Sequence, residues 1–272
     1  MKHKKYIMVY ILGGMSMIEI HTHILWAVDD GPKQMEETMQ PLKQAVNEGI
    51  TEIITTSHSF HPQYHVDYEM INNQIQLLQY QLIKNNIPLT LHTGHEVRLC
   101  DDVVSSIRAK KVHTLASSNY LLLELPSNTV PYYTIPLIRE LLAEGIIPII
   151  AHPERNKAIA ERPVHLERLI REGAMAQVTA GSLAGHFGRT IQNLSLDLVK
   201  ANLVHTYGSD VHNLTSRPFL FDEGLCFLEK KKELDAVEIL LENNARIVRN
   251  MPFIMQEPEE IETTKWWNIF SR

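Results

Sequence analysis

The sequence predicts a single α/β domain in which parallel strands alternate with helices and close into a barrel. Two observations lead to this prediction. Short apolar runs, many of them rich in β-branched residues, alternate with longer segments that have helical spacing. Seven such strand segments follow one another without a long break, an internal repeat or a low-complexity linker. Strands separated by helices form parallel sheets, and an unbroken series of them favours one barrel over two domains.

The expected elements are assigned by residue number. Glycine directly after a helical segment is a typical stop signal, and Gly49, Gly145 and Gly173 provide it for three helices. The predicted strands cover residues 17–21, 52–57, 89–94, 119–125, 147–151, 175–179 and 203–207. The predicted helices cover residues 35–47, 68–85, 136–143, 163–171, 191–200 and 222–243.

Composition excludes several classes of protein. The chain has 272 residues, of which 44% are hydrophobic, and this is enough to bury a sizeable core. The formal net charge is −6 and no long basic run occurs, so nucleic acid is not an expected partner. The two cysteines, Cys100 and Cys226, form no CxxC motif. A disulfide framework is therefore not expected, and the cytoplasm is the expected location.

The two ends of the chain differ from the rest. Residues 1–16 superficially resemble a signal peptide, but no A-x-A-like site follows, and the apolar run Tyr6–Leu12 is far shorter than the ~20 residues of a membrane span. We expect these residues to be a dispensable extension, with Met15 or Met17 as an alternative start. The domain is expected to cover residues 17–255.

Residues 256–272 are interpreted as a tail, because they are first acidic and then basic and aromatic. Trp266, Trp267 and Phe270 suit weak contact with a membrane surface. The alternative interpretations are that these residues dock on a neighbouring subunit of an oligomer or remain disordered.

Polar residues recur at or just beyond the carboxyl ends of the predicted strands. These ends open on one face of a parallel barrel, where chemistry occurs. His21 and His23 are two residues apart on an extended chain, so their side chains point the same way. Imidazole and carboxylate together suit Mn, Fe or Zn. The sequence therefore predicts a metal centre at this face. Its expected ligands are His21, His23, His58, Glu96, Glu124, His152, Asp210 and His212.

Several motifs in order resemble those of the polymerase-and-histidinol-phosphatase (PHP) superfamily. They are "IEIHTHILWAVDDGP", "TTSH", "GHE", "LLLELP", "IIAHPERN" and "SDVHN". The chain most resembles the bacterial protein-tyrosine phosphatase branch, whose members accompany tyrosine kinases that control capsule and exopolysaccharide synthesis. The resemblance extends from about residue 17 to residue 252 and includes "TAGSLAGHFG".

This resemblance implies a distorted seven-stranded, TIM-like (β/α) barrel with three divalent ions, usually manganese. By motif, the first ion would be held by His21, His23, Glu96 and Asp210. The second would be held by Glu96, Glu124 and His152, and the third by Asp30, His58 and His212. Arg155 and Arg217 match the phosphate-binding arginines of the family. Iron and zinc also accept these ligands, so the sequence leaves the metal open.

The expected reaction is attack of metal-activated hydroxide on the phosphorus of phosphotyrosine in the tail of a kinase. A cysteinyl route needs Cys-x5-Arg, but the residues six positions after the two cysteines are Ser106 and Lys232. His61 and His65 are candidates for proton donation or substrate contact, or else belong to a solvated loop. The alternative functions are a small-molecule phosphatase of the histidinol-phosphate type and a non-catalytic, metal-stabilised module that binds a kinase.

Overall fold

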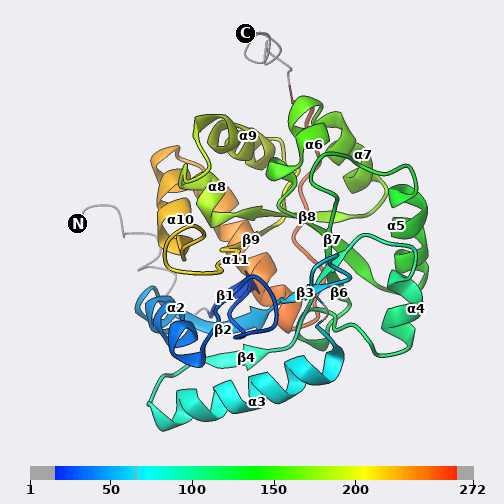
Figure 1. Cartoon of the computed structure of the whole chain (residues 1–272). Helices are drawn as coiled ribbons and strands as arrows, with labels where there is room; N and C mark the ends of the chain where they lie inside the picture. The colour runs from blue at the N-terminus through cyan, green and yellow to red at the C-terminus, as the bar shows by residue number, and fades with distance from the viewer. Residues whose placement is uncertain (1–15, 65, 262–272) are drawn as a thin grey trace.

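The computed structural model describes residues 16–64 and 66–261, which form two parallel sheets surrounded by helices (Figure 1). The first sheet contains, in spatial order, β1 (Met17–Thr22), β2 (Ile50–Thr55) and β4 (Thr90–His92). The second contains β3 (His58–Ser59), β5 (Glu96–Arg98), β6 (Tyr120–Glu124), β7 (Ile147–Ala151), β8 (Met175–Thr179) and β9 (Thr206–Gly208). The predicted α/β class with parallel strands is confirmed. The described residues contain nine strands, however, and not the expected seven.

Two interruptions account for the additional strands. The chain leaves β2 after Thr55 and resumes pairing as β3 at His58. It leaves β4 after His92 and resumes as β5 at Glu96. Glycine weakens a strand, and a side chain at Gly94 would clash with Ile54 at 2.8 Å. The predicted strands end at residues 57 and 94, so the sequence did not predict that strand pairing resumes at His58 and Glu96.

The main helices agree with the sequence prediction to within a few residues at most of their ends. They are α2 (Met35–Asn47), α3 (Tyr68–Lys84), α5 (Thr134–Ala143), α7 (Val164–Arg171) and α9 (Arg189–Lys200). The structure adds the short helices α4 (Val103–Arg108), α6 (Lys157–Glu161) and α8 (Ala180–Leu183), with 3₁₀ turns η1 (Leu115–Ser117) and η2 (Pro153–Arg155).

One predicted helix, residues 222–243, is wrong as a single element. It consists of α10 (Phe221–Lys230) and α11 (Leu234–Val248). Lys232 adopts a left-handed conformation with φ 68°, and the N–H of Glu233 donates to the carbonyl of Leu228 at 3.0 Å. This is the hydrogen bond of a Schellman helix end, a position where glycine is usual. Because lysine occupies it here, the sequence carried no stop signal.

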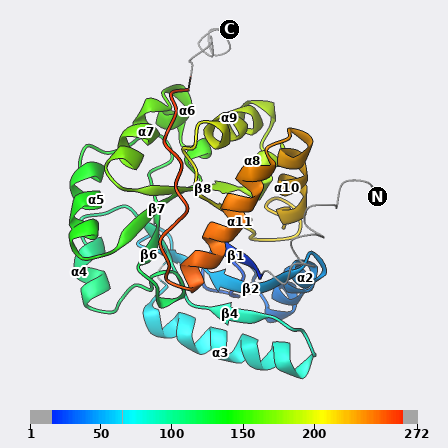
Figure 2. The same cartoon turned by 180° about the vertical axis from the view of Figure 1, so that it is seen from behind.

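The apolar core is divided by the strands into two clusters. The larger one lies between the strands and the outer helices. The smaller one contains Ile18, Ile20, Leu122 and Ile149 from the strands, together with Ile247 of α11. Figure 2, which views the molecule from behind, shows α11 crossing in front of the strands. The helix therefore covers the smaller cluster on one side and leaves the opposite ends of the strands to polar side chains.

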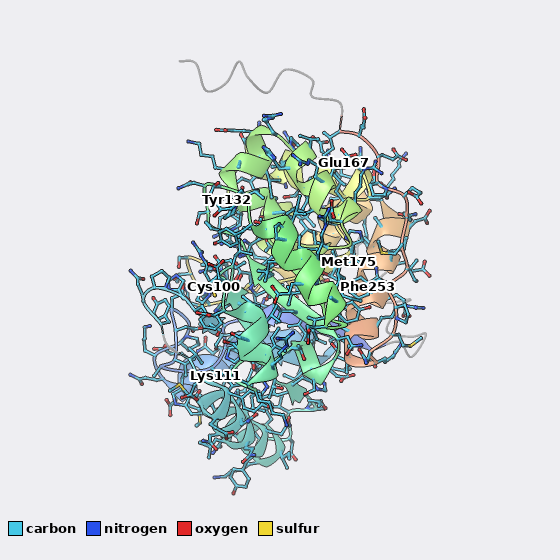
Figure 3. All side chains as sticks on the ribbon, turned by 90° about the vertical axis from the view of Figure 1, so that its right-hand side faces the viewer. Cys100, Lys111, Tyr132, Glu167, Met175 and Phe253 are labelled. Carbon is cyan, nitrogen blue, oxygen red and sulfur yellow. The ribbon has the colours of Figure 1, made fainter. Side chains whose placement is uncertain are left out.

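The carboxyl ends of the strands lie on the face away from α11. Figure 3 shows Cys100 and Tyr132, which follow β5 and β6, on the opposite side of the molecule from Met175, the first residue of β8. Phe253, which follows α11, lies on the side of Met175. Polar residues that follow different strands are thus brought to one face, as the sequence predicted.

The end of the described chain runs across the back of the molecule (Figure 2). The first residues of the expected tail take part, since the N–H of Glu259 donates to the carbonyl of Ala201 at 2.9 Å. Residues 1–15 and 262–272 lie outside the described residues, and with them almost all of the N-terminal extension and the tail aromatics. Among residues 16–64 and 66–261, no helix combines the length and the apolar character that crossing a membrane requires.

Candidate metal centre

The two histidines of the H-x-H motif are held at the end of β1 by the end of β9. The N–H of Asp210 donates to the carbonyl of His21 at 2.8 Å, and the N–H of His23 donates to the carbonyl of Val211 at 2.9 Å. Both histidine side chains are fully buried. These hydrogen bonds join two segments that are about 190 residues apart in sequence. They bring three of the expected ligands, His21, His23 and Asp210, close together.

All nine residues that the sequence predicts as ligands come together. Their imidazole and carboxylate atoms form four overlapping groups, within each of which the atoms lie no more than 4.8 Å apart. The groups are His23, Asp30, His58 and His212; His21, His23 and Glu96; His21, His152 and Asp210; and His58, Glu96 and Glu124. Three memberships differ from the expected division. His23 also joins the group of Asp30, His58 and His212, His152 joins His21 and Asp210, and Glu124 joins His58 as well as Glu96.

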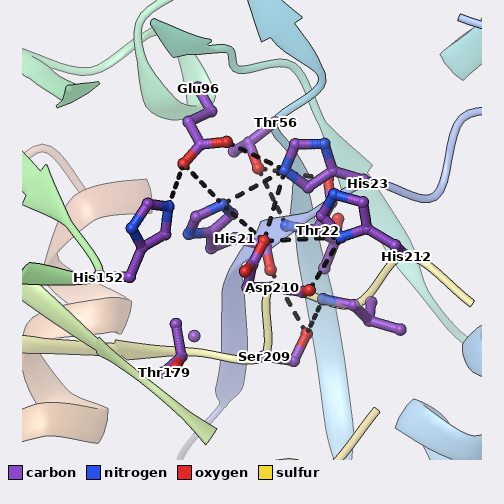
Figure 4. Close-up of polar contacts among 12 residues, drawn as sticks. His21, Thr22, His23, Thr56, Glu96, His152, Thr179, Ser209, Asp210 and His212 are labelled. Atoms are coloured by element: carbon purple, nitrogen blue, oxygen red, sulfur yellow. Dashed lines mark hydrogen bonds and ion pairs between the residues drawn. The ribbon is translucent and has the colours of Figure 1, made fainter. Parts of the chain in front are cut away.

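Glu96 connects several histidines of the cluster, and Figure 4 shows its carboxylate above His152, His21 and His23. Its Oε1 atom is 2.8 Å from Nε2 of His152 and 3.4 Å from Nε2 of His21. Its Oε2 atom is 3.2 Å from Nε2 of His23 and 3.1 Å from Nδ1 of His58. Around a cation with bonds of about 2.1 Å, neighbouring ligand atoms are about 3 Å apart, so these spacings suit shared cations.

The charges in the cluster favour added positive charge. Burial alone would lower the pKa of His21, but the carboxylates of Glu96 and Asp210 raise it to about 9. Burial opposes protonation of His58 as well, yet Glu96 and Asp30 raise its pKa to about 11. A field that holds protons on buried imidazoles also attracts divalent cations. Because a ligating imidazole must be neutral, cation binding would release these protons.

Unsatisfied polar atoms test whether the residues fit metal ions. Buried polar atoms in proteins are nearly always hydrogen bonded. Five atoms of the cluster are buried without a hydrogen bond: Asp30 Oδ1, His58 Nδ1, Glu96 Oε2, Glu124 Oε2 and His212 Nε2. All belong to imidazole or carboxylate groups, which are the usual ligands of Mn, Fe and Zn. The donor set therefore fits divalent ions.

Two outer residues that the sequence prediction of ligands did not include orient the paired histidines. Nδ1 of His21 donates to Oε1 of Gln177 at 2.9 Å, and the amide group of Gln177 donates to the carbonyl of Val178. Nδ1 of His23 donates to Oδ2 of Asp29 at 2.9 Å. In both rings Nε2 is left facing the cluster, as metal ligation requires. The signal for Asp29 is the pair Asp29–Asp30 in the "VDDG" stretch, whereas nothing in the sequence marks Gln177.

A third residue missed by sequence reasoning, Glu19, joins β1 to β9. Its carboxylate accepts hydrogen bonds from the N–H of His21 at 2.7 Å and the N–H of Ser209 at 2.8 Å. The residue is fully buried, and this burial raises its pKa to about 7. The carboxylate therefore fixes the backbone next to His21 and Asp210.

Two of the predicted ligands have unusual backbone conformations. His152 and Asp210 follow β7 and β9 with φ angles of 33° and 55°. Left-handed conformations cost residues other than glycine roughly 1–2 kcal/mol. Strain of this kind persists where surrounding contacts enforce it, typically at functional sites. Here it turns both side chains towards the cluster.

The two predicted phosphate-binding arginines lie beside the cluster. Nη2 of Arg217 is 2.8 Å from Oδ2 of Asp210, and Nη1 is 3.0 Å from Oδ2 of Asp30. Arg155 also pairs with Asp210. Burial would raise the pKa of Asp210, but the two guanidinium groups hold it well below its usual range. Both arginines are partly exposed, so they line the approach to the cluster.

The remaining candidates lie around the approach. His61 stacks on His58 with ring centroids 4.7 Å apart, whereas His65 lies outside the described residues. In the loop between α8 and α9, Phe187 lies under the guanidinium of Arg155 at 5.2 Å, and His186 donates to the carbonyl of Ser216 at 2.8 Å. This loop therefore supports the segments that carry both arginines.

Comparison with known proteins agrees with this geometry. The family described as capsular polysaccharide synthesis, CpsB/CapC, matches residues 17–249. The chain belongs to the CpsB/CapC family. Family membership confirms the resemblance to the bacterial tyrosine phosphatase branch that the motifs indicated.

Family relatives match over almost the whole chain. The chain is 39% identical over 254 residues to the putative tyrosine-protein phosphatase CapC of Staphylococcus aureus, and 37% identical over 254 residues to the tyrosine-protein phosphatase YwqE of Bacillus subtilis. Each match covers 93% of this chain and 100% of the relative. A crystal structure from work on YwqE and on CpsB of Streptococcus pneumoniae, described as unique metal-dependent tyrosine phosphatases, has a TM-score of 0.88 and 38% identity. It covers 90% of this chain and 100% of that chain.

Proposed function

We propose that the protein is a metal-dependent tyrosine phosphatase that hydrolyses phosphotyrosine on a bacterial kinase controlling capsule or exopolysaccharide synthesis. The observation that carries this proposal is the convergence of nine potential ligands with two arginines beside them. The names of the CapC and YwqE relatives support the choice of substrate. We propose the cytoplasm as the location, since Cys100 and Cys226 are both unpaired thiols.

We assign the nine residues His21, His23, Asp30, His58, Glu96, Glu124, His152, Asp210 and His212 as ligands of three divalent ions, with Mn²⁺ as the expected metal. The four overlapping groups and the buried atoms without hydrogen bonds support this assignment. Divalent cations at this position would lower the pKa of water towards neutrality and neutralise phosphoryl charge.

The residues of the chain would hold and orient the substrate. Arg155 and Arg217 would bind the non-bridging oxygens of the phosphoryl group, because guanidinium pairs with phosphate in a bidentate manner. Gln177 and Asp29 would keep the ligand histidines in the required tautomer. The tyrosine hydroxyl has a pKa of about 10, which makes phenolate a tolerable leaving group. A strong general acid is then unnecessary.

Phosphate release from p-nitrophenyl phosphate and from a phosphotyrosine peptide, with Mn²⁺ or with EDTA, tests this function. Turnover of both substrates that EDTA abolishes is expected. Turnover of histidinol phosphate alone would favour the small-molecule phosphatase. Binding of a kinase tail without any turnover would favour the non-catalytic module.

We also infer that the nine strands trace a distorted seven-stranded barrel, in which β2–β3 and β4–β5 are each one interrupted strand. β3 pairs with β5 as β2 pairs with β4, which supports this view. The bridge between Thr22 and Val211 supports closure between β1 and the end of β9. A crystal structure without this bridge would contradict the closed form.

Residues 17–255 are proposed as the catalytic domain and residues 1–16 as a dispensable extension. A chain that begins at Met17 should keep its thermal stability and its activity, and loss of either would refute this proposal.

Weak contact of the tail with membranes predicts that removing residues 262–272 lowers binding to anionic liposomes. Unchanged binding would exclude it.

A further inference from the structure

Arg98 is a third arginine beside the metal cluster, and neither the motifs nor the proposed function assigns it a role. It is the last residue of β5, two positions after Glu96. Side chains two apart on a strand point to the same face. Val97, between them, is fully buried in the outer apolar cluster. The guanidinium of Arg98 therefore lies on the cluster side of the strand, one step further towards solvent than the central carboxylate.

The contacts of Arg98 repeat the pattern of the other two arginines. Nη1 of Arg98 is 2.9 Å from Oε2 of Glu124, its partner across the ladder between β5 and β6. Arg155 and Arg217 likewise pair with Asp210. Each guanidinium thus contacts a carboxylate of the proposed ligand set. Asp210 and Glu124 belong to different ligand groups, so Arg98 approaches the cluster from another side.

The side chain of Arg98 is only partly buried beside the cluster. A guanidinium carries five N–H donors. Within the described residues, the acid it contacts is Glu124, and the Arg98 side chain is 23% exposed. It lies close enough to His61 and Tyr133 to act on both electrostatically. Arg98 is therefore a partly buried cation beside the cluster, and it has more N–H donors than its contact with Glu124 uses.

We propose that Arg98 is a phosphate-binding residue, which contacts the phosphoryl group of the substrate from the side opposite Arg155 and Arg217. The proposal rests on the proposed phosphatase function. A phosphoryl group has three non-bridging oxygens, and guanidinium groups on two sides would hold it in one orientation. The main competing role is structural: Arg98 would only hold Glu124 in place for a metal ion.

The variants Arg98→Gln and Arg98→Lys separate these roles. Arg98→Gln should raise the Kd for inorganic phosphate, measured by calorimetry on the Mn²⁺-loaded protein, and the KM for p-nitrophenyl phosphate by about tenfold or more. Metal content by elemental analysis should not change. Arg98→Lys should recover part of the lost phosphate affinity, because lysine keeps the positive charge but lacks the paired N–H donors of guanidinium.

The matched control is Arg139→Gln on α5, which removes a surface pair with Glu172, the residue after α7, and should change none of these quantities. Loss of bound metal in Arg98→Gln would overturn the proposal in favour of the structural role. Loss confined to a phosphotyrosine peptide, with p-nitrophenyl phosphate unaffected, would assign Arg98 to a neighbouring residue of the peptide instead. No change in either constant would also refute it. If the unmodified protein shows no turnover, the proposed function fails, while phosphate binding still tests Arg98.

Discussion

The carboxylate of Asp29 orients the imidazole of His23, whose Nδ1 atom lies 2.9 Å from Oδ2 of Asp29. The same carboxylate accepts the N–H groups of Gly31 at 3.0 Å and His58 at 3.2 Å. It thus accepts three donors and sits behind two of the proposed ligands, His23 and His58. Carboxylates in this position orient the ring and increase its basicity as a ligand.

Asp29→Asn should weaken Mn²⁺ binding by about 10- to 100-fold. The amide cannot accept hydrogen bonds at both of its terminal atoms, so at least one of the three donors is left unpaired. The affinity can be measured by competition with a chelator. The matched control is Asp235→Asn, an exposed aspartate in the first turn of α11, which should leave the affinity unchanged. Equal affinities for both variants would contradict the role of Asp29.

His152→Ala and Arg217→Ala should separate metal binding from substrate binding. His152→Ala removes a ligand 2.8 Å from Glu96 and should abolish activity through loss of metal. Arg217→Ala should keep the metal but lower kcat/KM by about 10- to 100-fold, as expected for lost hydrogen bonds to a charged group. Elemental analysis and steady-state kinetics measure the two effects. Metal loss in the arginine variant would show that the division is wrong.

Gly224→Ala should destabilise the protein although alanine is the better helix former. A side chain at Gly224 in α10 would collide with the hydroxyl of Tyr207 and lie 2.9 Å from the carbonyl of Ala180. It would also displace the hydrogen bond from Tyr207 to the carbonyl of Phe221. The expected loss in the free energy of unfolding is about 2–4 kcal/mol.

The comparison variant for this prediction is Glu223→Ala, an exposed position on the same helix, where the change should stay within about 0.5 kcal/mol. Both values come from denaturant unfolding with equal m-values. A Gly224→Ala protein as stable as the unmodified chain would mean that α10 and α8 are not packed as closely as described here.

His205 should make the folded state sensitive to acid. It is a buried residue directly before β9, and its Nδ1 accepts the N–H of Ala176 at 3.2 Å. Burial lowers its pKa to about 4. The unfolded chain binds this proton near pH 6.5. The contribution to stability is therefore complete above about pH 6.5 and is lost as the pH falls towards about 4. Between about pH 7.5 and pH 5 the loss is about 2 kcal/mol.

His205→Asn removes the titrating group and retains an acceptor for Ala176. Between about pH 7.5 and pH 5, the unfolding free energy of the unmodified protein should fall by about 2 kcal/mol more than that of the His205→Asn protein. Urea unfolding in EDTA at several pH values measures it without a contribution from released metal. Parallel curves for the two proteins would rule out this role.

The sequence predicted which polar residues the structure brings together, and their order along the chain. Local patterns carry this information: His21 and His23 follow an apolar run, and His152 and Asp210 follow others. Because parallel strands end on a common face, residues that follow strands meet there whatever the details of the barrel. The same local patterns gave helices such as α2 to the residue.

Only the tertiary structure decided the elements that depend on contacts between distant segments. Gln177 acts on His21 across 156 residues, and Glu19 acts on Ser209 across 190 residues, so no local pattern marks either residue. The breaks between β2 and β3 and between β4 and β5 likewise follow from packing across the sheets. Periodicity reports which face of its own strand a side chain occupies, whereas hydrogen bonding between strands decides what that side chain contacts.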